Sequence, residues 1–526
     1  MNSKGCVVNV DGDLFWYMYE SNKCRLDDFE DVIKAYVEGY ANRGISDLIF
    51  TCFCQQSVIP TKVWDWFGDK YNQKVENGVE VDYTKLKRIK HIVDIYSTMQ
   101  RDPFDILIEE ARKHNMGAWL SVRMNDCHCH HEKTSFLHGS MYYEGLKNGW
   151  FIGGAVPYTW AECYDYSLEI IRNKMLAYLF ELLDNHDMDG LELDFQREIY
   201  CFDYINNPEC YKIMTDFIQK VRTYVRKKEE ERGHKIKLGI RLCRNIEDNK
   251  TFGFDIVEWI KQGLVDVVVP TSRWENTDSE MPIKAWRKLV DGTGVELWAG
   301  VEENIFVPFM NTEETLKGFT VEYLEAGADK MYLYNLFRTR GRDEELSVED
   351  LVASRSKHDC YNWRIGSDYR ERWLRRSWRA CSNLEEAKKG VRRNIMTFQE
   401  ECMAPKGAEC FKPFPVQVET EKRFVMQTGN CYLQKTKFFV GLGKNSQIPE
   451  IIIDGKPATY IGEAEDSYMD SPMFSDEGQD RLVGYAANKG AKYYAYEFEA
   501  NDKHEREIIV KGNCELRYFE VKVEGN

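Results

Sequence analysis

Short apolar runs alternate with longer amphipathic stretches from the N-terminus to about residue 340. Polar and charged residues follow nearly every one of the apolar runs. This alternation is typical of α/β folds with parallel strands. The predicted strands begin at Cys6, Asp47, Gly117, Asp189, Ile236, Val265, Val295 and Asp329. Amphipathic segments at 26–44, 163–186 and 253–263 predict helices between them.

Eight strands with intervening helices fit a closed (β/α)8 barrel, but they also fit a doubly wound open sheet. An open dinucleotide-binding sheet carries a glycine-rich phosphate loop after its first strand, and this sequence has none there. Polar and charged residues instead gather after nearly every predicted strand, which is where a barrel keeps its active site. The sequence therefore predicts an α/β fold, a (β/α)8 TIM barrel, over residues 1–345.

The pattern changes beyond residue 345. Residues 346–411 are charged and predict a helical linker that packs on the barrel, with a helix around 383–398. After Pro413, short alternating segments are separated by Gly, Asn and Asp, which predicts an all-β, jelly-roll-like sandwich over 412–526. Such a domain can bind sugars or can support the barrel, and the sequence leaves both roles open.

Composition narrows the classes of partner. A net charge of −16 argues against nucleic acid and against an anionic membrane surface. The N-terminus lacks a signal-peptide pattern, no run is apolar enough to span a bilayer, and the 16 cysteines lack the spacing of a disulfide scaffold. We therefore expect a cytoplasmic protein with reduced thiols and no cofactor. The sequence is compatible with a homo-oligomer.

The fourth predicted strand carries the most informative polar residues. In the run DGLELDFQR, period-two alternation places Glu192, Asp194 and Gln196 on one face. If that face points into the barrel, Asp194 reaches the active-site end and Glu192 lies one layer deeper, where a carboxyl group must be paired or neutral. The alternative is that both carboxyl groups are structural and are held by buried arginines such as Arg241.

The seventh predicted strand repeats this arrangement, because VELWAGVEENI places Glu302 at the end of its inward face. Carboxyl groups at the ends of strands four and seven face each other across a barrel. Such a pair suits glycoside cleavage, and a separation of about 5 Å predicts retention whereas about 6.5–9.5 Å predicts inversion. The sequence gives neither that distance nor which of Asp194 and Glu302 is the acid.

The third predicted strand runs into a polar loop. Arg123 and Asn125 alternate to one face and suit hydrogen bonding to hydroxyl or carboxyl groups. The following run, Asp126 to His131, resembles a set of metal ligands. These residues are nearly contiguous, however, and no distant CxxC completes a tetrahedral site. We therefore favour Asp126 and His128 as sugar-contacting or acid–base groups.

Further polar side chains follow the other predicted strands, and a tryptophan among them could stack on a sugar ring. Taken alone, each of these residues is a weak signal, but all are expected at one end of the barrel. The predicted catalytic residues are Asp194 and Glu302. The predicted substrate-binding residues are Asp11, Gln55, Arg123, Asn125, Asp126, His128, Glu192, Gln196, Arg197, Arg241, Trp274 and Asn335.

The run DMDGLELDFQR, with Asp165 and Tyr166 upstream, resembles the strand-four signature of glycosyl-hydrolase-like barrel proteins of the hydrolase-like family 10 kind. Further similar runs are VRMND with His128, GFDIVEWIKQGLVDVVVPTS, WAGVEEN and AGADKMYLYNLF. The resemblance covers most of residues 1–340. It implies a barrel and a glycosidase activity without naming a substrate.

The same strand also resembles the DG-x-D-x-D-x-E motif of family 18 chitinases, which ends on the catalytic acid. Here that position is Gln196, which cannot protonate a leaving group, and Glu192 replaces the first Asp of the internal pair. We therefore reject the substrate-assisted chitinase mechanism. The leading hypothesis is a glycoside hydrolase acting on an oligosaccharide or small glycoside. The alternatives are a metal-assisted hydrolase or lyase using Asp126–His131 and a non-catalytic sugar-binding barrel.

Overall fold

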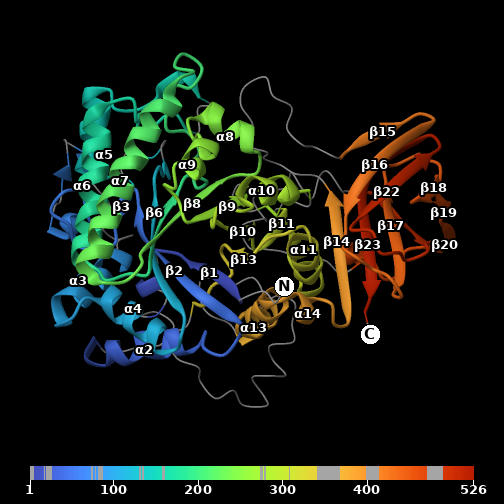
Figure 1. The fold of residues 1–526 in the computed structure, drawn as a ribbon, viewed down its shortest axis with the longest axis horizontal. Coiled ribbons are helices and arrows are strands. Elements are labelled where there is room, and N and C mark those ends of the chain that lie inside the picture. The colour runs from blue at the N-terminus through green and yellow to red at the C-terminus, as the bar shows by residue number, and fades with distance from the viewer. Residues whose placement is uncertain are drawn as a thin grey trace.

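The structure is a computed structural model of the 526-residue chain, with a barrel and a two-sheet β domain side by side (Figure 1). It describes residues 5–12, 14–16, 18, 26–72, 75–76, 79–80, 87–129, 132, 135–156, 160–272, 276–277, 280–306, 309–339, 368–397, 414–470 and 490–525. Across these residues, no helix is both long and apolar enough to cross a membrane.

The predicted barrel is confirmed. Its eight parallel strands pair in the order β1, β2, β6, β7, β8, β9, β10 and β13, and β13 pairs back onto β1. All eight coincide with the runs predicted as strands. Their bounds are Cys6–Val10 (β1), Ile45–Cys54 (β2), Gly117–Arg123 (β6), Gly190–Asp194 (β7), Lys237–Cys243 (β8), Val267–Thr271 (β9), Glu296–Val301 (β10) and Lys330–Leu333 (β13).

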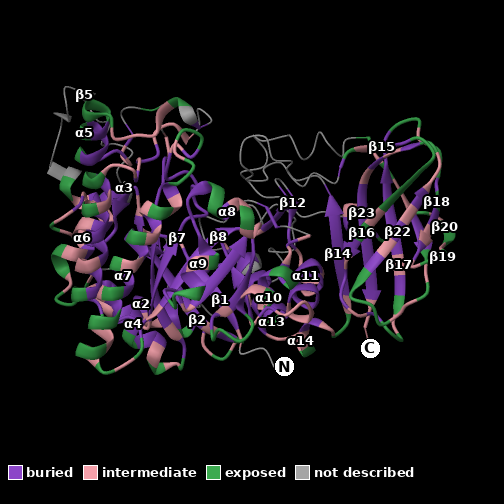
Figure 2. Cartoon of the chain, turned by 45° about the horizontal axis from the view of Figure 1, so that its top comes forward, coloured by how far each residue is buried: buried purple, intermediate pink, exposed green. Residues whose placement is uncertain are grey.

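Amphipathic helices surround the barrel, and burial follows their inward faces (Figure 2). The segments predicted at 26–44, 163–186 and 253–263 contain α2 (Phe29–Glu38), α6 (Glu169–Asn185) and α9 (Ile256–Lys261). The remaining bounds are α3 Lys87–Thr98, α4 Pro103–Lys113, α5 Ser140–Asn148, α7 Cys210–Arg232, α8 Ile246–Phe252, α10 Ile283–Val290 and α11 Glu313–Glu325. Local sequence sets several starts: Asp102 caps α4 by accepting a hydrogen bond from the Phe104 backbone, 2.8 Å away.

The barrel interior is filled in layers. At the amino ends of the strands, Lys330 pairs with Asp47 at 2.6 Å. Above it, an apolar layer includes Trp119 and Trp298, whose ring centroids lie 5.2 Å apart. Gly190 makes room for this layer, because a Cβ there would lie 2.2 Å from the Trp119 ring. The barrel is therefore closed at this end, and any site must lie toward the carboxyl ends of the strands.

The C-terminal domain is a β-sandwich of two antiparallel sheets. One sheet contains β14 (Val391–Thr397), β15 (Val416–Val418), β17 (Lys435–Leu442), β20 (Thr459–Glu463), β21 (Lys492–Glu497) and β23 (Cys514–Glu524). The other contains β16 (Glu421–Gln427), β18 (Glu450–Ile453), β19 (Lys456–Pro457) and β22 (Glu505–Lys511). Apolar side chains from both sheets form its core.

The helix predicted around 383–398 is largely wrong. Only a short helix, α14 (Leu384–Ala387), forms there, and Gly390 adopts a positive φ of 69° before β14 begins. Strand β14 pairs along its length with β23, so a segment assigned to the linker belongs to the sandwich sheet. The charged side chains of β14 do not all lie in solvent. Arg393 is buried, and its charge is balanced by Glu520 and Glu314.

The linker region also supplies α13 (Asp368–Ser382), which packs against α11, α14 and the barrel strands β1 and β13. The barrel itself meets the sandwich through α11, which lies against β14. Gly318 of α11 permits this close approach, because a Cβ there would lie 2.0 Å from the Arg393 carbonyl oxygen. The two parts therefore share an extensive packed boundary.

Candidate active site

The candidate site lies at the carboxyl ends of the barrel strands, an end called the mouth below. Neighbouring strands align their inward residues there, because Arg123 of β6 pairs in register with Asp194 of β7, and Asp194 pairs with Arg241 of β8. This confirms the predicted inward face of strand four. Three charged side chains consequently form one row across the barrel wall.

Asp194 is the carboxyl group of this row and accepts several hydrogen bonds. Arg241 Nη1 lies 3.1 Å from both carboxylate oxygens, and the backbone amides of Gln196 and Arg197 donate to Oδ1 at 2.9 and 3.1 Å. Both Asp194 and Arg241 are buried. Burial lowers the pKa of Arg241, but Asp194 and the other acidic groups around it together hold that pKa above its usual value. This environment suits a carboxylate anion.

Arg241 also stacks on an aromatic ring. Its guanidinium lies 3.9 Å from the centre of the Tyr334 ring, a cation–π contact that fixes its plane. Tyr334 in turn accepts a hydrogen bond from Arg123 Nη2 at 3.3 Å. Burial raises the pKa of Tyr334 to about 12, so the phenol is neutral at physiological pH.

Arg123 organises the other side of the mouth. It pairs with Asp11 at 3.0 Å and with Asp126 at 3.2 Å. Asp126 also contacts His128 Nδ1, and Arg197 donates to His128 Nε2. Although burial raises the pKa of Asp126, His128 and the two arginines hold it below its usual value. These five predicted site residues are thus brought together.

Glu302 follows β10 and is buried at the mouth. Asn335, also predicted, donates to its Oε2 at 3.1 Å. The Glu302 backbone is fixed by two residues that sequence reasoning missed: Thr277 Oγ1 accepts from its amide at 3.1 Å, and Asn311 Nδ2 donates to its carbonyl at 2.8 Å. Both lie in loops outside any periodic pattern, so no local signal marks them.

Glu192 lies one layer below Asp194, as predicted. Its Oε1 accepts hydrogen bonds from Ser121 at 2.7 Å, Tyr332 at 3.1 Å and Asn9 at 3.2 Å. Burial and the charge of Asp194 raise the pKa of Glu192 from 4.5 to about 7. Tyr332 is a further residue that sequence reasoning did not select. Its direct neighbours here are protein groups, and the predicted contact of Glu192 with substrate stays a prediction.

Asn125, Gln55 and Trp274 are three further residues that the sequence predicts in the site. The Asn125 amide holds loops together, because it donates to the Tyr164 and Tyr200 carbonyls and accepts from the Tyr164 amide. The Gln55 backbone has a positive φ of 63° where β2 ends. Trp274 lies outside the described residues.

The suggested metal cluster is only partly described. Within the described part of the chain, no group of three or more His, Cys, Asp or Glu side chains could hold a metal ion. His130 and His131 fall outside that part. Of the four members that are described, Asp126 and His128 contact each other and the neighbouring arginines, and Cys127 and Cys129 are reduced thiols.

Several buried polar atoms at the mouth have no hydrogen-bond partner among the described residues. They are Arg123 Nε, Arg241 Nε, Arg241 Nη2, Gln196 Oε1, Gln55 Oε1, Thr271 Oγ1 and Asn304 Oδ1. Buried polar groups normally have a partner. Donors and acceptors are both represented, which suits a ligand that can offer hydrogen bonds of both kinds.

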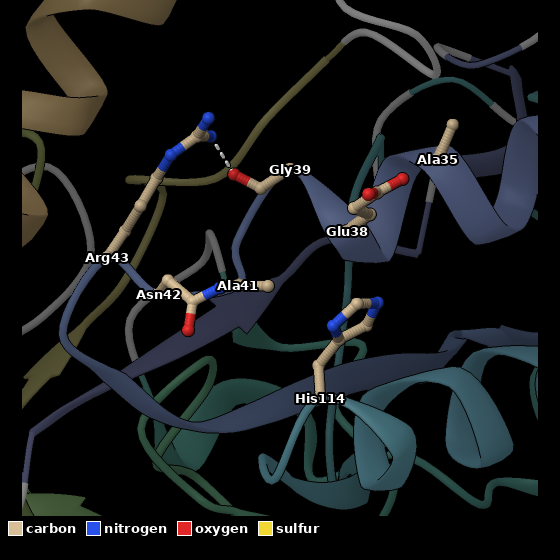
Figure 3. Close-up of a pocket in the computed structure, with 7 residues that line it drawn as sticks. All are labelled: Ala35, Glu38, Gly39, Ala41, Asn42, Arg43 and His114. Carbon is tan, nitrogen blue, oxygen red and sulfur yellow. Dashed lines mark hydrogen bonds between the residues drawn. The ribbon is translucent and has the colours of Figure 1, made fainter.

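Two pockets lie away from the mouth. One, of about 560 Å³, is lined by the end of α2 and by His114, at the amino ends of β2 and β6 (Figure 3). Arg43 spans it by donating to the Gly39 carbonyl. The other, of about 370 Å³, lies between α6 and α7. The first lies at the amino ends of the strands, the end of a (β/α)8 barrel that contributes to stability rather than to catalysis. Neither pocket contains a predicted site residue.

The sandwich supports the segment that follows Glu302. Strands β11 (Asn304–Phe306) and β12 (Phe309–Met310) form a hairpin there. Its side chains Ile305, Phe306 and Phe309 pack with Tyr468 and Tyr518 of the sandwich. The Tyr468 hydroxyl also donates to the Met310 carbonyl at 2.6 Å. The sandwich therefore positions part of the mouth.

We expect Tyr468→Phe to lower the free energy of unfolding by about 1 kcal/mol, because it removes a buried hydrogen bond and leaves the Met310 carbonyl unpaired. Chemical denaturation measures this change. Tyr460→Phe, at a half-exposed position of β20, is the matched control and should change stability by less than about 0.5 kcal/mol. Equal effects of the two substitutions would show that the contact does not stabilise the hairpin.

No protein-family model and no curated protein matches the chain. A solved cycloisomaltooligosaccharide glucanotransferase from Paenibacillus sp. aligns over 98% of this chain and 57% of its own, at 10% identity and a TM-score of 0.34. Chitinase ChiW from Paenibacillus sp. aligns over 97% and 52%, at 8% identity and a TM-score of 0.40. The chain thus spans about half the length of these two proteins.

Alpha-L-fucosidase AlfC from Lactobacillus casei aligns over 71% of this chain and 93% of its own, at 12% identity and a TM-score of 0.34. At such identities and TM-scores, these likenesses carry no argument about the reaction of this chain. The resemblance to the hydrolase-like family 10 kind stays a prediction.

Proposed function

We propose that this protein is a glycoside hydrolase whose reacting groups are Asp194 and Glu302. The observation that carries the proposal is the mouth itself. Two buried carboxyl groups, from β7 and from the end of β10 three strands away, lie among side chains whose hydrogen-bonding atoms lack a partner within the described residues. A sugar offers hydroxyl groups that both donate and accept, so it can satisfy atoms of both kinds.

The surroundings of Asp194 suggest how the two carboxyl groups divide the work. Asp194 receives hydrogen bonds from Arg241 and from two backbone amides, which favours its anion. An anion at this position can attack the anomeric carbon, activate water or stabilise positive charge in the transition state. The proton donor to the leaving oxygen is then Glu302.

The arginines would bind and orient the sugar. Arg123 and Arg197 are joined through Asp126 and His128, so their positions are fixed before substrate arrives. Donors that are already fixed reduce the entropic cost of substrate binding. Asp11, Gln55, Gln196, Asn335 and Trp274 complete the proposed binding set, with Asn125 holding the loops around it.

A turnover screen against aryl glycosides and oligosaccharides, with and without a chelator, tests this function. We expect turnover of at least one glycoside that the chelator does not change. Turnover abolished by the chelator would instead assign the reaction to the Asp126–His131 cluster. The anomer released first, followed by NMR, would distinguish retention from inversion.

A non-catalytic sugar-binding barrel is the second candidate. It is favoured by Gln196 in place of an acid and by the protein donors that already bind Asp194. Calorimetry with the same sugars separates the two functions. Binding of a sugar that no condition hydrolyses would support the second and contradict the first.

A further inference from the structure

Glu192 receives its hydrogen bonds on one side only. Three donors, from Ser121, Tyr332 and Asn9, converge on Oε1. Oε2 is buried and has no partner among the described residues. The donors are themselves fixed, because Asn9 also donates to the Tyr332 hydroxyl at 2.8 Å and accepts from Thr51 at 3.3 Å.

The burial of Oε2 without a donor favours a neutral carboxylic acid, whereas the hydrogen bonds to Oε1 by themselves favour the anion. In the acid, Oε1 is the carbonyl oxygen that accepts hydrogen bonds and Oε2 carries the proton. In the anion, half of the negative charge would lie on Oε2, a buried atom with no donor, which is costly. Burial and the charge of Asp194 act in the same direction, since they raise the pKa of Glu192 to about 7.

The charged groups that face Glu192 are Asp194 on its own strand and Arg241 on β8. Tyr332 of β13 faces it as a neutral phenol, since burial raises the pKa of Tyr332 well above its usual value. β1 and β6 contribute the uncharged Asn9 and Ser121. Arg241 interacts with both carboxyl groups. An anionic Glu192 below Arg241 would compete with Asp194 for the positive charge of Arg241.

We infer that Glu192 is a protonated positioning residue that leaves Arg241 to Asp194, and that loss of its proton disables the mouth. This regulation rests on the proposed function of the same site. It requires no contact between Glu192 and substrate. Glu192, one layer below the reacting groups, thereby sets the highest pH at which the side chains of the mouth keep their arrangement.

The sign of the pH effect follows from the direction of the shift. The pKa of Glu192 is higher in the folded chain than its ordinary value of 4.5. Its contribution to stability is therefore fully present below pH 4.5 and is lost as the pH rises toward 7. Between pH 6 and pH 8 the protonated fraction falls about tenfold.

Infrared difference spectroscopy of the native chain against Glu192→Gln tests the protonation state without substrate. We expect a carbonyl band of a protonated carboxylic acid at pH 6 in the native chain only, and we expect it to fade near pH 7. The absence of this band at pH 6 would overturn the inference. Thermal unfolding gives a second readout, because Glu192→Gln should unfold at a higher temperature than the native chain at pH 8.

Ser121→Ala provides a second variant in case Glu192→Gln does not fold. The Ser121 hydrogen bond lowers the pKa of Glu192, so its removal should keep the acid band visible to higher pH. A band that fades at lower pH in Ser121→Ala would contradict the assignment to Glu192.

The positioning role is tested by the pH profile of turnover on a glycoside found in the screen. In the native chain, turnover should fall about tenfold between pH 6 and pH 8, and in Glu192→Gln this alkaline limb should move to higher pH. A native acid band with an alkaline limb that does not move would overturn the positioning role alone. If no glycoside is turned over, the proposed function fails, and the band and thermal unfolding decide the protonation state by themselves.

Discussion

Glu302→Gln is expected to lower turnover by about 10²–10⁴-fold, the range that a general acid contributes. Glutamine keeps the shape of the side chain and can still bond to Asn335, but it has no proton to give to the leaving oxygen. Because the Glu302 backbone is held by Thr277 and Asn311, the substitution should leave the fold intact. The loss should appear in kcat, with KM changed little.

Glu296→Gln is the matched control. Glu296 begins β10, which Glu302 follows, and so lies at the opposite end of the barrel, where it pairs with Lys237. It should therefore keep native turnover. Asp194→Asn should also lose turnover, with some loss of stability because Arg241 loses its anion. Native turnover in Glu302→Gln would remove Glu302 from the chemistry and leave the fold unaffected.

The barrel was predictable because its strands are marked twice, by apolar runs and by the polar residues that follow them. Period-two alternation also placed Glu192 and Asp194 on the inward face at two successive depths. Alternation is a property of a single strand, so it can be recognised without knowing which strands are its neighbours. The mouth could therefore be located from the sequence.

The partners across the barrel could not be predicted in the same way. The pairing of Arg241 with Asp194 was weighed from the sequence only as a structural alternative, and it proves to be the central contact of the mouth. The stacking of Arg241 on Tyr334 joins two residues that are 93 positions apart in the sequence. Such contacts follow from barrel closure rather than from local pattern.

Support from remote segments was equally hidden. Tyr468 of the sandwich holds the hairpin after Glu302, and α13 supplies Arg370, which donates to the Asn335 carbonyl at 3.1 Å. The charged run that forms β14 was predicted as part of a helix. In the structure Arg393 finds its anions on α11 and β23, and these lie far away in the sequence.

Arg241→Met is expected to lower the free energy of unfolding by about 3–5 kcal/mol, because it leaves the buried charge of Asp194 without its cation. Both partners are almost completely buried, at 0% and 1% exposure of their side chains, so water cannot replace the arginine. Denaturant unfolding at pH 7 measures the change. Combining Arg241→Met with Asp194→Asn should recover part of the loss, since the two substitutions remove one interaction.

Arg287→Met separates this effect from the loss of an arginine as such. Arg287 pairs with Asp329 at the same distance of 3.1 Å, but the side chains are 29% and 36% exposed. Water and salt screen such a pair, so its removal should cost at most about 1 kcal/mol. If the two variants lose equal stability, the Asp194–Arg241 pair is not the buried charge pair on which the proposed site depends. A much larger loss in Arg241→Met would support a buried charge pair between Asp194 and Arg241.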